Sequence, residues 1–207
     1  MVYELAVQKH PHSLYVKIDL LMKVILFDFF GVLSSPVYST IFKKYFSDEV
    51  ECQEWTNKLV DLDLAILSEE DLVTQLSNRL KISKDTLKAE VNNTSELNQS
   101  LINYIRDELK GKYTTGILSN IATSIFDRIL PNERELFDVL FISSELHLVK
   151  PDPRIFQLAI EKSGVEAGEI LFIDDRAENI QAAKALGVNG IVYKDFASFK
   201  QELATYL

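Results

Sequence analysis

Four groups of polar residues in this chain follow short apolar runs, and their side chains could take part in chemistry. They are Asp28, the dipeptide Ser119–Asn120, Lys150 and the acid pair Asp174–Asp175. Each group alone is typical of a turn, a helix cap or plain surface. Together they comprise a carboxylate nucleophile, a hydroxyl with backbone amides, a cation and paired acids, which is the set that phosphoryl transfer requires.

The acid pair Asp174–Asp175 directly follows the apolar run ILFI, so one of the two carboxylates must lie near a buried sheet end. Adjacent carboxylates repel each other, and a bound cation offsets that repulsion. Ligands that are all oxygen favour Mg²⁺ over zinc. Because capping of the next helix accounts for only one of the two acids, we expect a magnesium site here.

The elements that must position these residues are apolar runs too short for buried helices. They cover residues 23–27, 115–118, 139–142, 170–173 and 190–193. Such runs are typical of strands in a parallel sheet covered on both faces. The segments 121–130, 153–163 and 177–186 have the three- and four-residue apolar spacing of helices. This alternation predicts an α/β fold with a doubly wound parallel sheet, whose strand ends meet at one crevice.

The stretch between the first two predicted strands is far longer than one crossover helix requires. It has amphipathic helical patterns at 69–80 and 96–109, and it has no convincing strand. We therefore predict an α/β catalytic core made of residues 22–33 and 99–207, with an inserted helical cap at 34–98. The helix at 96–109 would return the chain to the core.

Residues 1–21 form an N-terminal segment for which two interpretations stay open. Leu14–Asp19 could form an additional strand, or Met22 could be the natural start with the preceding residues as an extension. The segment has no small-residue cleavage site after an apolar core, so a signal peptide is not expected.

The composition of the 207-residue chain is that of an ordinary globular protein, with 47% hydrophobic and 26% charged residues. The formal net charge of −9 argues against nucleic acid or an anionic membrane as the main partner. Charged residues interrupt the most apolar stretch, 14–33, so we expect no transmembrane segment. The single cysteine, Cys52, favours a reducing compartment, and we expect a cytoplasmic protein. The oligomeric state cannot be predicted from the sequence.

The order and context of the motifs resemble those of the haloacid dehalogenase-like (HAD) superfamily, which has a Rossmann-like core. The resembling segments are Asp28–Val32 for motif I, Ser119 for motif II, Lys150 in LVKPDPRIF for motif III and Asp174–Asp175 in FIDDRAENI for motif IV. The resemblance runs from about residue 23 to the C-terminus and is weak within the cap. Within the superfamily, the sequence looks most like sugar-phosphate phosphatases whose motif I is altered.

This resemblance implies a phosphatase that acts on a small phosphorylated metabolite through an aspartyl phosphate on Asp28. The implied Mg²⁺ ligands are Asp28, the backbone carbonyl of Phe30, Asp174 and Asp175. The implied phosphoryl-binding groups are the Ser119 hydroxyl, the Asn120 backbone N–H and the Lys150 ammonium, with Lys150 also counted as catalytic.

Phe30 departs from the family pattern, in which this position is the aspartate that serves as general acid and base. Phenylalanine cannot transfer a proton, and general acid–base catalysis contributes about 10²–10⁴-fold to a rate. We therefore expect a preference for activated leaving groups. His147 and residues of the cap are candidates for a replacement acid, although a surface position is favoured for His147.

Two alternative functions stay open at this point. Haloacid dehalogenases also have an aromatic residue at the position of Phe30, but they need no metal and lack the paired acids of Asp174–Asp175. The second alternative is a non-catalytic descendant that binds a phospho-ligand or a partner protein through its cap. Phe30 motivates this alternative, whereas the other motif residues argue against lost chemistry.

Overall fold

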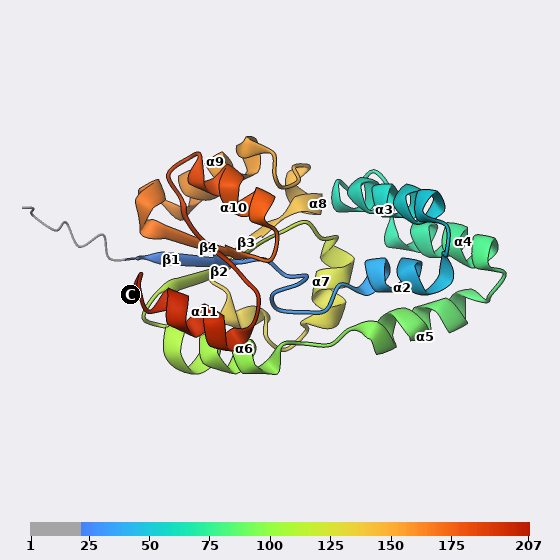
Figure 1. The fold of residues 1–207 in the computed structure, drawn as a ribbon, viewed down its shortest axis with the longest axis horizontal. Coiled ribbons are helices and arrows are strands. Elements are labelled where there is room, and N and C mark those ends of the chain that lie inside the picture. Colours follow the sequence, from blue (N-terminus) through green and yellow to red (C-terminus); the bar gives the residue numbers. More distant parts are fainter. Residues whose placement is uncertain (1–21) are drawn as a thin grey trace, which may run out of the picture.

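The computed structural model describes residues 22–207, so the strand considered at 14–19 lies outside the described residues. One parallel five-stranded sheet has the order β3-β2-β1-β4-β5 (Figure 1). Its strands are β1 (Val24–Phe27), β2 (Thr114–Ser119), β3 (Val139–Ile142), β4 (Ile170–Asp174) and β5 (Asn189–Val192). The predicted α/β fold is confirmed, and the strand that precedes Asp28 lies at the centre of the sheet.

Helices cover both faces of the sheet because successive side chains of a strand point to opposite sides. Ile25 and Phe27 of β1 belong to one apolar cluster, and Val24 and Leu26 belong to another on the opposite face. Helices α6, α7 and α11 contribute to the first cluster, whereas α9 and α10 contribute to the second (Figure 1). These helices are α6 (Gln99–Tyr104), α7 (Thr123–Ile129), α9 (Pro153–Ser163), α10 (Ala177–Lys184) and α11 (Phe196–Leu203).

The ends of several predicted helices differ from the structure for local reasons. The helix predicted from residue 121 begins at Thr123, because the Ile121 N–H donates to the Ser143 hydroxyl at 2.9 Å. The helix predicted from residue 96 begins at Gln99, where the Asn98 side chain serves as the cap, and it ends in a π-helical turn at Ile105–Leu109.

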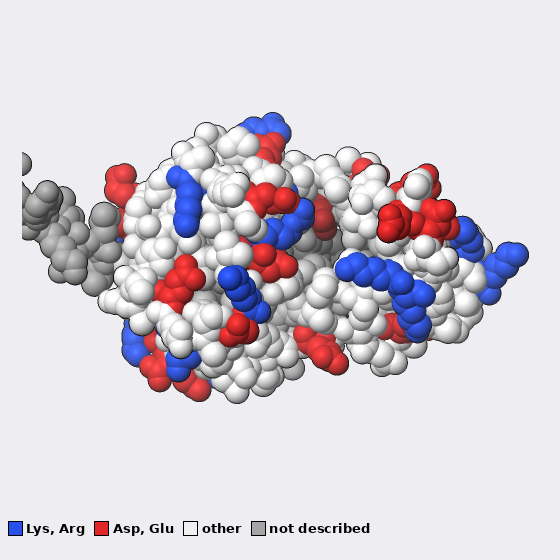
Figure 2. Space-filling model, viewed as in Figure 1, with Lys and Arg blue, Asp and Glu red and all other residues white. Residues whose placement is uncertain are grey.

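Residues 34–98, which we call the insertion, contain four of the helices between β1 and β2. They are α2 (Val37–Tyr45), α3 (Glu49–Asp63), α4 (Glu69–Leu80) and α5 (Lys84–Thr94). Asp48, Ser68 and Ser83 cap the last three of these helices by accepting backbone N–H groups. The insertion lies beyond the carboxyl ends of the strands (Figure 1). Figure 2 shows that the surface is hollowed where the insertion meets the core.

The two ends of the insertion lie side by side, and we call this paired segment the neck. Ser34 pairs with Leu97 in an antiparallel bridge, and the Ser35 N–H donates to the Glu96 carbonyl at 2.9 Å. The Ser35 hydroxyl also accepts the Glu96 N–H at 2.9 Å. The chain therefore leaves the core and returns to it at one place.

Helix α4 also contacts the core through Glu69, at its first turn. The Glu69 carboxylate accepts the Tyr38 hydroxyl at 2.8 Å and the Ser124 hydroxyl at 3.0 Å, and it pairs with Arg128 at 2.7 Å. A cavity of about 460 Å³ lies beside this contact, and none of the sequence-predicted site residues lines it. Each helix within residues 22–207 is too short or too polar to cross a membrane.

Candidate active site

Asp28 is the first residue after the central strand β1. Its backbone N–H donates to the Ile173 carbonyl of β4 at 2.8 Å, and its Oδ1 accepts the Phe29 N–H at 2.7 Å. Burial raises the pKa of the Asp28 carboxyl to about 7, against an opposing effect of Lys150 and with a further increase from Asp174. The sheet therefore fixes this carboxylate at a buried position, where its charge depends on neighbouring cations.

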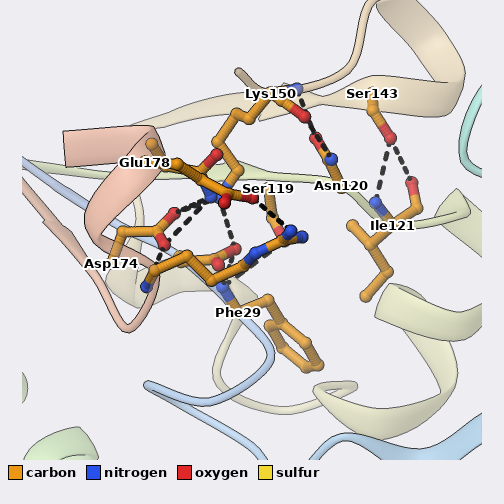
Figure 3. Close-up of polar contacts among 11 residues, drawn as sticks. Phe29, Ser119, Asn120, Ile121, Ser143, Lys150, Asp174 and Glu178 are labelled. Carbon is orange, nitrogen blue, oxygen red and sulfur yellow. Dashed lines mark hydrogen bonds and ion pairs between the residues drawn. The ribbon is translucent and has the colours of Figure 1, made fainter. Parts of the chain in front are cut away.

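The Lys150 ammonium lies between two carboxylates (Figure 3). Its Nζ is 2.8 Å from Asp28 Oδ1 and 2.6 Å from Asp174 Oδ2, and the lysine side chain is buried. The ammonium also lies 5.1 Å from the centre of the Phe172 ring. The structure thus brings together three of the residues that were predicted from separate motifs.

Asp174 is completely buried at the end of β4 and is surrounded by donors. Besides Lys150, it accepts the Arg176 N–H at 2.8 Å and the Asn179 side-chain amide at 2.9 and 3.0 Å. Sequence reasoning did not identify Asn179 as a site residue. The available signal was a polar residue directly before Ile180 on the buried face of α10.

The side chains of Asp28, Asp174 and Asp175 bring one carboxylate oxygen each within 4.8 Å of one another. Asp175 is exposed, and partial desolvation together with the Asp174 charge raises its pKa. When all three acids are ionised, one lysine leaves two negative charges uncompensated, and this all-oxygen set fits Mg²⁺. Gly31 makes room for the cluster, because a Cβ there would lie 2.3 Å from Asp175 Oδ2.

Ser119 and Asn120 follow β2 as predicted, but their side chains have different contacts. The Ser119 hydroxyl is buried at 3.4 Å from the Phe29 N–H. The Asn120 side chain instead binds the backbone of Lys150 (Figure 3): its Oδ1 accepts the Lys150 N–H at 2.7 Å, and its Nδ2 donates to the Lys150 carbonyl at 3.0 Å. Asn120 therefore positions the loop that bears the lysine, a role that sequence reasoning missed.

Phe30 lies beside the acids and is half-buried, with its ring 5.2 Å from that of Phe29 in an edge-on contact. No backbone donor in residues 22–207 binds the Phe30 carbonyl, which was predicted as a metal ligand. Phe30 also lines a cavity of about 70 Å³, together with Asn120 and with Asp63 from the insertion. Sequence reasoning did not identify Asp63.

A protein-family model described as haloacid dehalogenase-like hydrolase matches residues 22–187. The chain belongs to this family. The predicted superfamily and the prediction of an enzyme are thereby confirmed.

Similar proteins include both complete and partial matches. The D-ribitol-5-phosphate phosphatase of Bacteroides thetaiotaomicron is 26% identical over an alignment of 205 residues, and the alignment covers 90% of this chain and 99% of that protein. The Acyl-CoA dehydrogenase family member 10 of Mus musculus is 37% identical over 82 residues, which cover 40% of this chain but only 8% of the mouse protein. That match therefore aligns less than half of this chain with a small part of a much longer protein.

Solved HAD structures share the fold. A HAD family enzyme from Bacteroides thetaiotaomicron, in complex with magnesium and inorganic phosphate, has a TM-score of 0.72 and 21% identity, with coverage of 86% of this chain and 98% of that one. A dehalogenase has a TM-score of 0.61 and 18% identity, with coverage of 82% and 83%. Because both kinds of enzyme share the fold, the choice between them depends on the residues of the site.

Proposed function

We propose that this HAD-like hydrolase is a magnesium-dependent phosphatase that acts on a small phosphorylated metabolite through an aspartyl phosphate on Asp28. The observation that carries the proposal is the cluster of Asp28, Asp174 and Asp175 beside a single buried lysine. An excess of negative charge around a nucleophile calls for a cation before an anionic phosphate can approach. The near full-length similarity to a phosphatase supports the same choice.

The two carboxylate oxygens of Asp28 differ in their contacts. Oδ1 is held by Lys150 and by the Phe29 N–H, so we assign Oδ2 as the attacking atom. Its attack forms a bond to phosphorus while the bond from phosphorus to the leaving oxygen breaks, and the electron pair remains on that oxygen. Water then attacks the same phosphorus, the bond to Asp28 breaks, and inorganic phosphate leaves.

The remaining residues bind and orient the phosphoryl group. Lys150 and the Ser119 hydroxyl lie at the end of β1, and together with the Asn120 backbone N–H they would bind the phosphoryl oxygens. Mg²⁺ held by the three acids and the Phe30 carbonyl would reduce the electrostatic repulsion between the Asp28 carboxylate and the anionic phosphate. Asn120 and Asn179 would keep Lys150 and Asp174 in place, because each binds its partner twice.

We further propose that the insertion acts as a cap over the substrate. It lies beyond the strand ends and contributes Tyr38 and Asp63 to the small cavity beside Phe30. Groups of the substrate other than the phosphoryl group would therefore contact the insertion, and the choice of metabolite would depend on it.

A dehalogenase is the second candidate, and the aromatic side chain of Phe30 favours it. In that reaction Asp28 would attack carbon and release halide without a metal. A protein that only binds would instead retain magnesium and phosphate without turnover.

A rapid-quench time course with p-nitrophenyl phosphate tests the proposal, with Mg²⁺, with EDTA and with an Asp28→Asn variant. We expect a metal-dependent burst of about one nitrophenolate per active site, which the variant lacks. Halide release from 2-chloropropionate in EDTA would overturn the phosphatase assignment in favour of the dehalogenase. Binding of inorganic phosphate with no release from any aryl phosphate would favour the binding protein.

A further inference from the structure

The position of Phe30 leaves the site without the acid that a phosphatase needs for a poor leaving group. The cavity of about 70 Å³ beside Phe30 extends from Asn120 at the core to Asp63 at the insertion. Its walls are otherwise mostly apolar, and among residues 22–207 Asp63 is the only carboxyl residue that lines it. Phe30 from the core and Asp63 from the insertion therefore line the same cavity.

Asp63 occupies an unfavourable position by the rules of helix structure. It is the last residue of α3, where the helix dipole favours cations, and no basic residue lies in that last turn. The residue is half-buried, and no hydrogen bond from residues 22–207 is among the influences on its carboxyl group. A carboxyl group that lines a cavity and whose pKa is shifted by burial and by a nearby charge is a candidate functional group.

The electrostatic environment of Asp63 connects it to the nucleophile. Burial raises the pKa of the Asp63 carboxyl to about 7, with a further increase from the negative charge of Asp28 and a decrease from Lys150. Asp28 and Lys150 are therefore close enough to the Asp63 carboxyl group to shift its pKa. A carboxyl group with this pKa can donate a proton and later accept one near neutral pH.

His147 lies at the same end of α3 but has a different contact. Its Nδ1 is 3.0 Å from the backbone carbonyl of Leu64, the residue that follows Asp63, and the contact is exposed. The ring therefore holds the end of the helix against the core. Of the replacement acids considered from the sequence, a residue of the insertion fits the geometry better than His147.

We propose that Asp63 is the general acid and base of this enzyme and takes the role that Phe30 cannot fill. This inference rests on the proposed phosphatase function. In the first step the Asp63 proton moves to the leaving oxygen as its bond to phosphorus breaks. In the second step the Asp63 carboxylate takes a proton from the water that attacks the aspartyl phosphate. This step returns Asp63 to its protonated form and frees the Asp28 carboxylate.

Two substrates of similar shape test this role, because they differ in their need for a proton. The nitrophenolate of p-nitrophenyl phosphate leaves without protonation, whereas the leaving group of phenyl phosphate is more basic. We expect Asp63→Asn to lower the rate of the first step, measured as single-turnover release of phenol or nitrophenolate, by about 10²-fold or more for phenyl phosphate and by less than about threefold for p-nitrophenyl phosphate. Hydrolysis of the aspartyl phosphate is common to both substrates, so its rate should fall equally for both. Asp61→Asn, an exposed change in the same last turn of α3, should alter neither rate.

A second background separates proton transfer from a structural role. With Phe30→Asp present, which restores an acid at motif I, Asp63→Asn should lower turnover of phenyl phosphate only slightly. An equal loss of the first-step rate for both substrates, or no loss for either, would overturn the role of Asp63 and leave the phosphatase function intact. Absence of any Mg²⁺- and Asp28-dependent turnover in the unmodified protein would overturn the phosphatase function and this inference with it.

Discussion

Replacing Lys150 with methionine keeps most of the side-chain length and removes the cation between Asp28 and Asp174. The lysine lies 2.8 and 2.6 Å from the two carboxylates, and all three groups are buried. Removing one partner of a buried ion pair typically lowers stability by about 3–5 kcal/mol. That is a large share of the total stability of a domain, which is about 5–15 kcal/mol.

The size of this loss should depend on pH, and the sign follows from Asp28. Its pKa is already raised to about 7 by burial although Lys150 lowers it, so removal of the lysine raises it further. A raised carboxyl pKa in the folded state gives a stability contribution that is present at low pH and is lost as pH rises through that pKa. We expect a loss of about 3–5 kcal/mol near pH 9 and of about 1–2 kcal/mol near pH 6.

Urea unfolding in EDTA, followed by circular dichroism at both pH values, measures these losses. The double variant Asp28→Asn/Lys150→Met is the matched control, because it removes one of the uncompensated charges. We expect it to recover about 1–2 kcal/mol near pH 9. Equal losses at the two pH values, without recovery in the double variant, would mean that Lys150 stabilises the fold by packing on Phe172 rather than by its charge.

Three further predictions concern residues around the acid cluster. Gly31→Ala should lower stability by about 1–2 kcal/mol and weaken Mg²⁺ binding in calorimetry. Gly111→Ala is the control: Gly111 has a similar φ, and a Cβ there would meet no atom within 4 Å, so Mg²⁺ binding should be unchanged. Asn179→Ala should weaken Mg²⁺ binding by about 10–100-fold because Asp174 loses its side-chain amide donor, and unchanged affinity would contradict that role. Asp63→Asn should raise the free energy of unfolding by about 1 kcal/mol near pH 9 and have little effect near pH 5, because burial raises the pKa of the ionisable carboxyl group. The expected gain is small because the residue is partly exposed. A loss of stability near pH 9 would show that the ionised carboxylate stabilises the fold.

The core of the fold could be predicted from the sequence because its strands are short, apolar and followed by polar residues. In a parallel sheet the carboxyl ends of neighbouring strands meet, so Asp28, Lys150 and Asp174 could be expected at one place from their order alone. The helix ends were less predictable. They depend on single hydrogen bonds from distant residues, such as that between Ser143 and Ile121.

The parts of the site that could not be predicted depend on tertiary contacts. The side chain of Asn120 binds the backbone of Lys150, and nothing in the local sequence indicates which partner an asparagine selects. Asp63 reaches the cavity only because the end of α3 is held against the core, with His147 bound to Leu64. The acidic last turn of α3 was a usable signal for Asp63, although by itself it does not show which way the helix faces.

The neck has a consequence for how this chain can vary. Because Ser34 and Leu97 are paired neighbours, the backbone enters and leaves the insertion across a short gap. Segments whose ends are adjacent can be lengthened, shortened or exchanged with little strain on the remaining chain. The strand that carries Asp28 can thus keep its register against β2 and β4 while the helices beyond the neck are remodelled. The proposed phosphoryl-transfer centre can in this way serve different substrates through exchange of a single contiguous module.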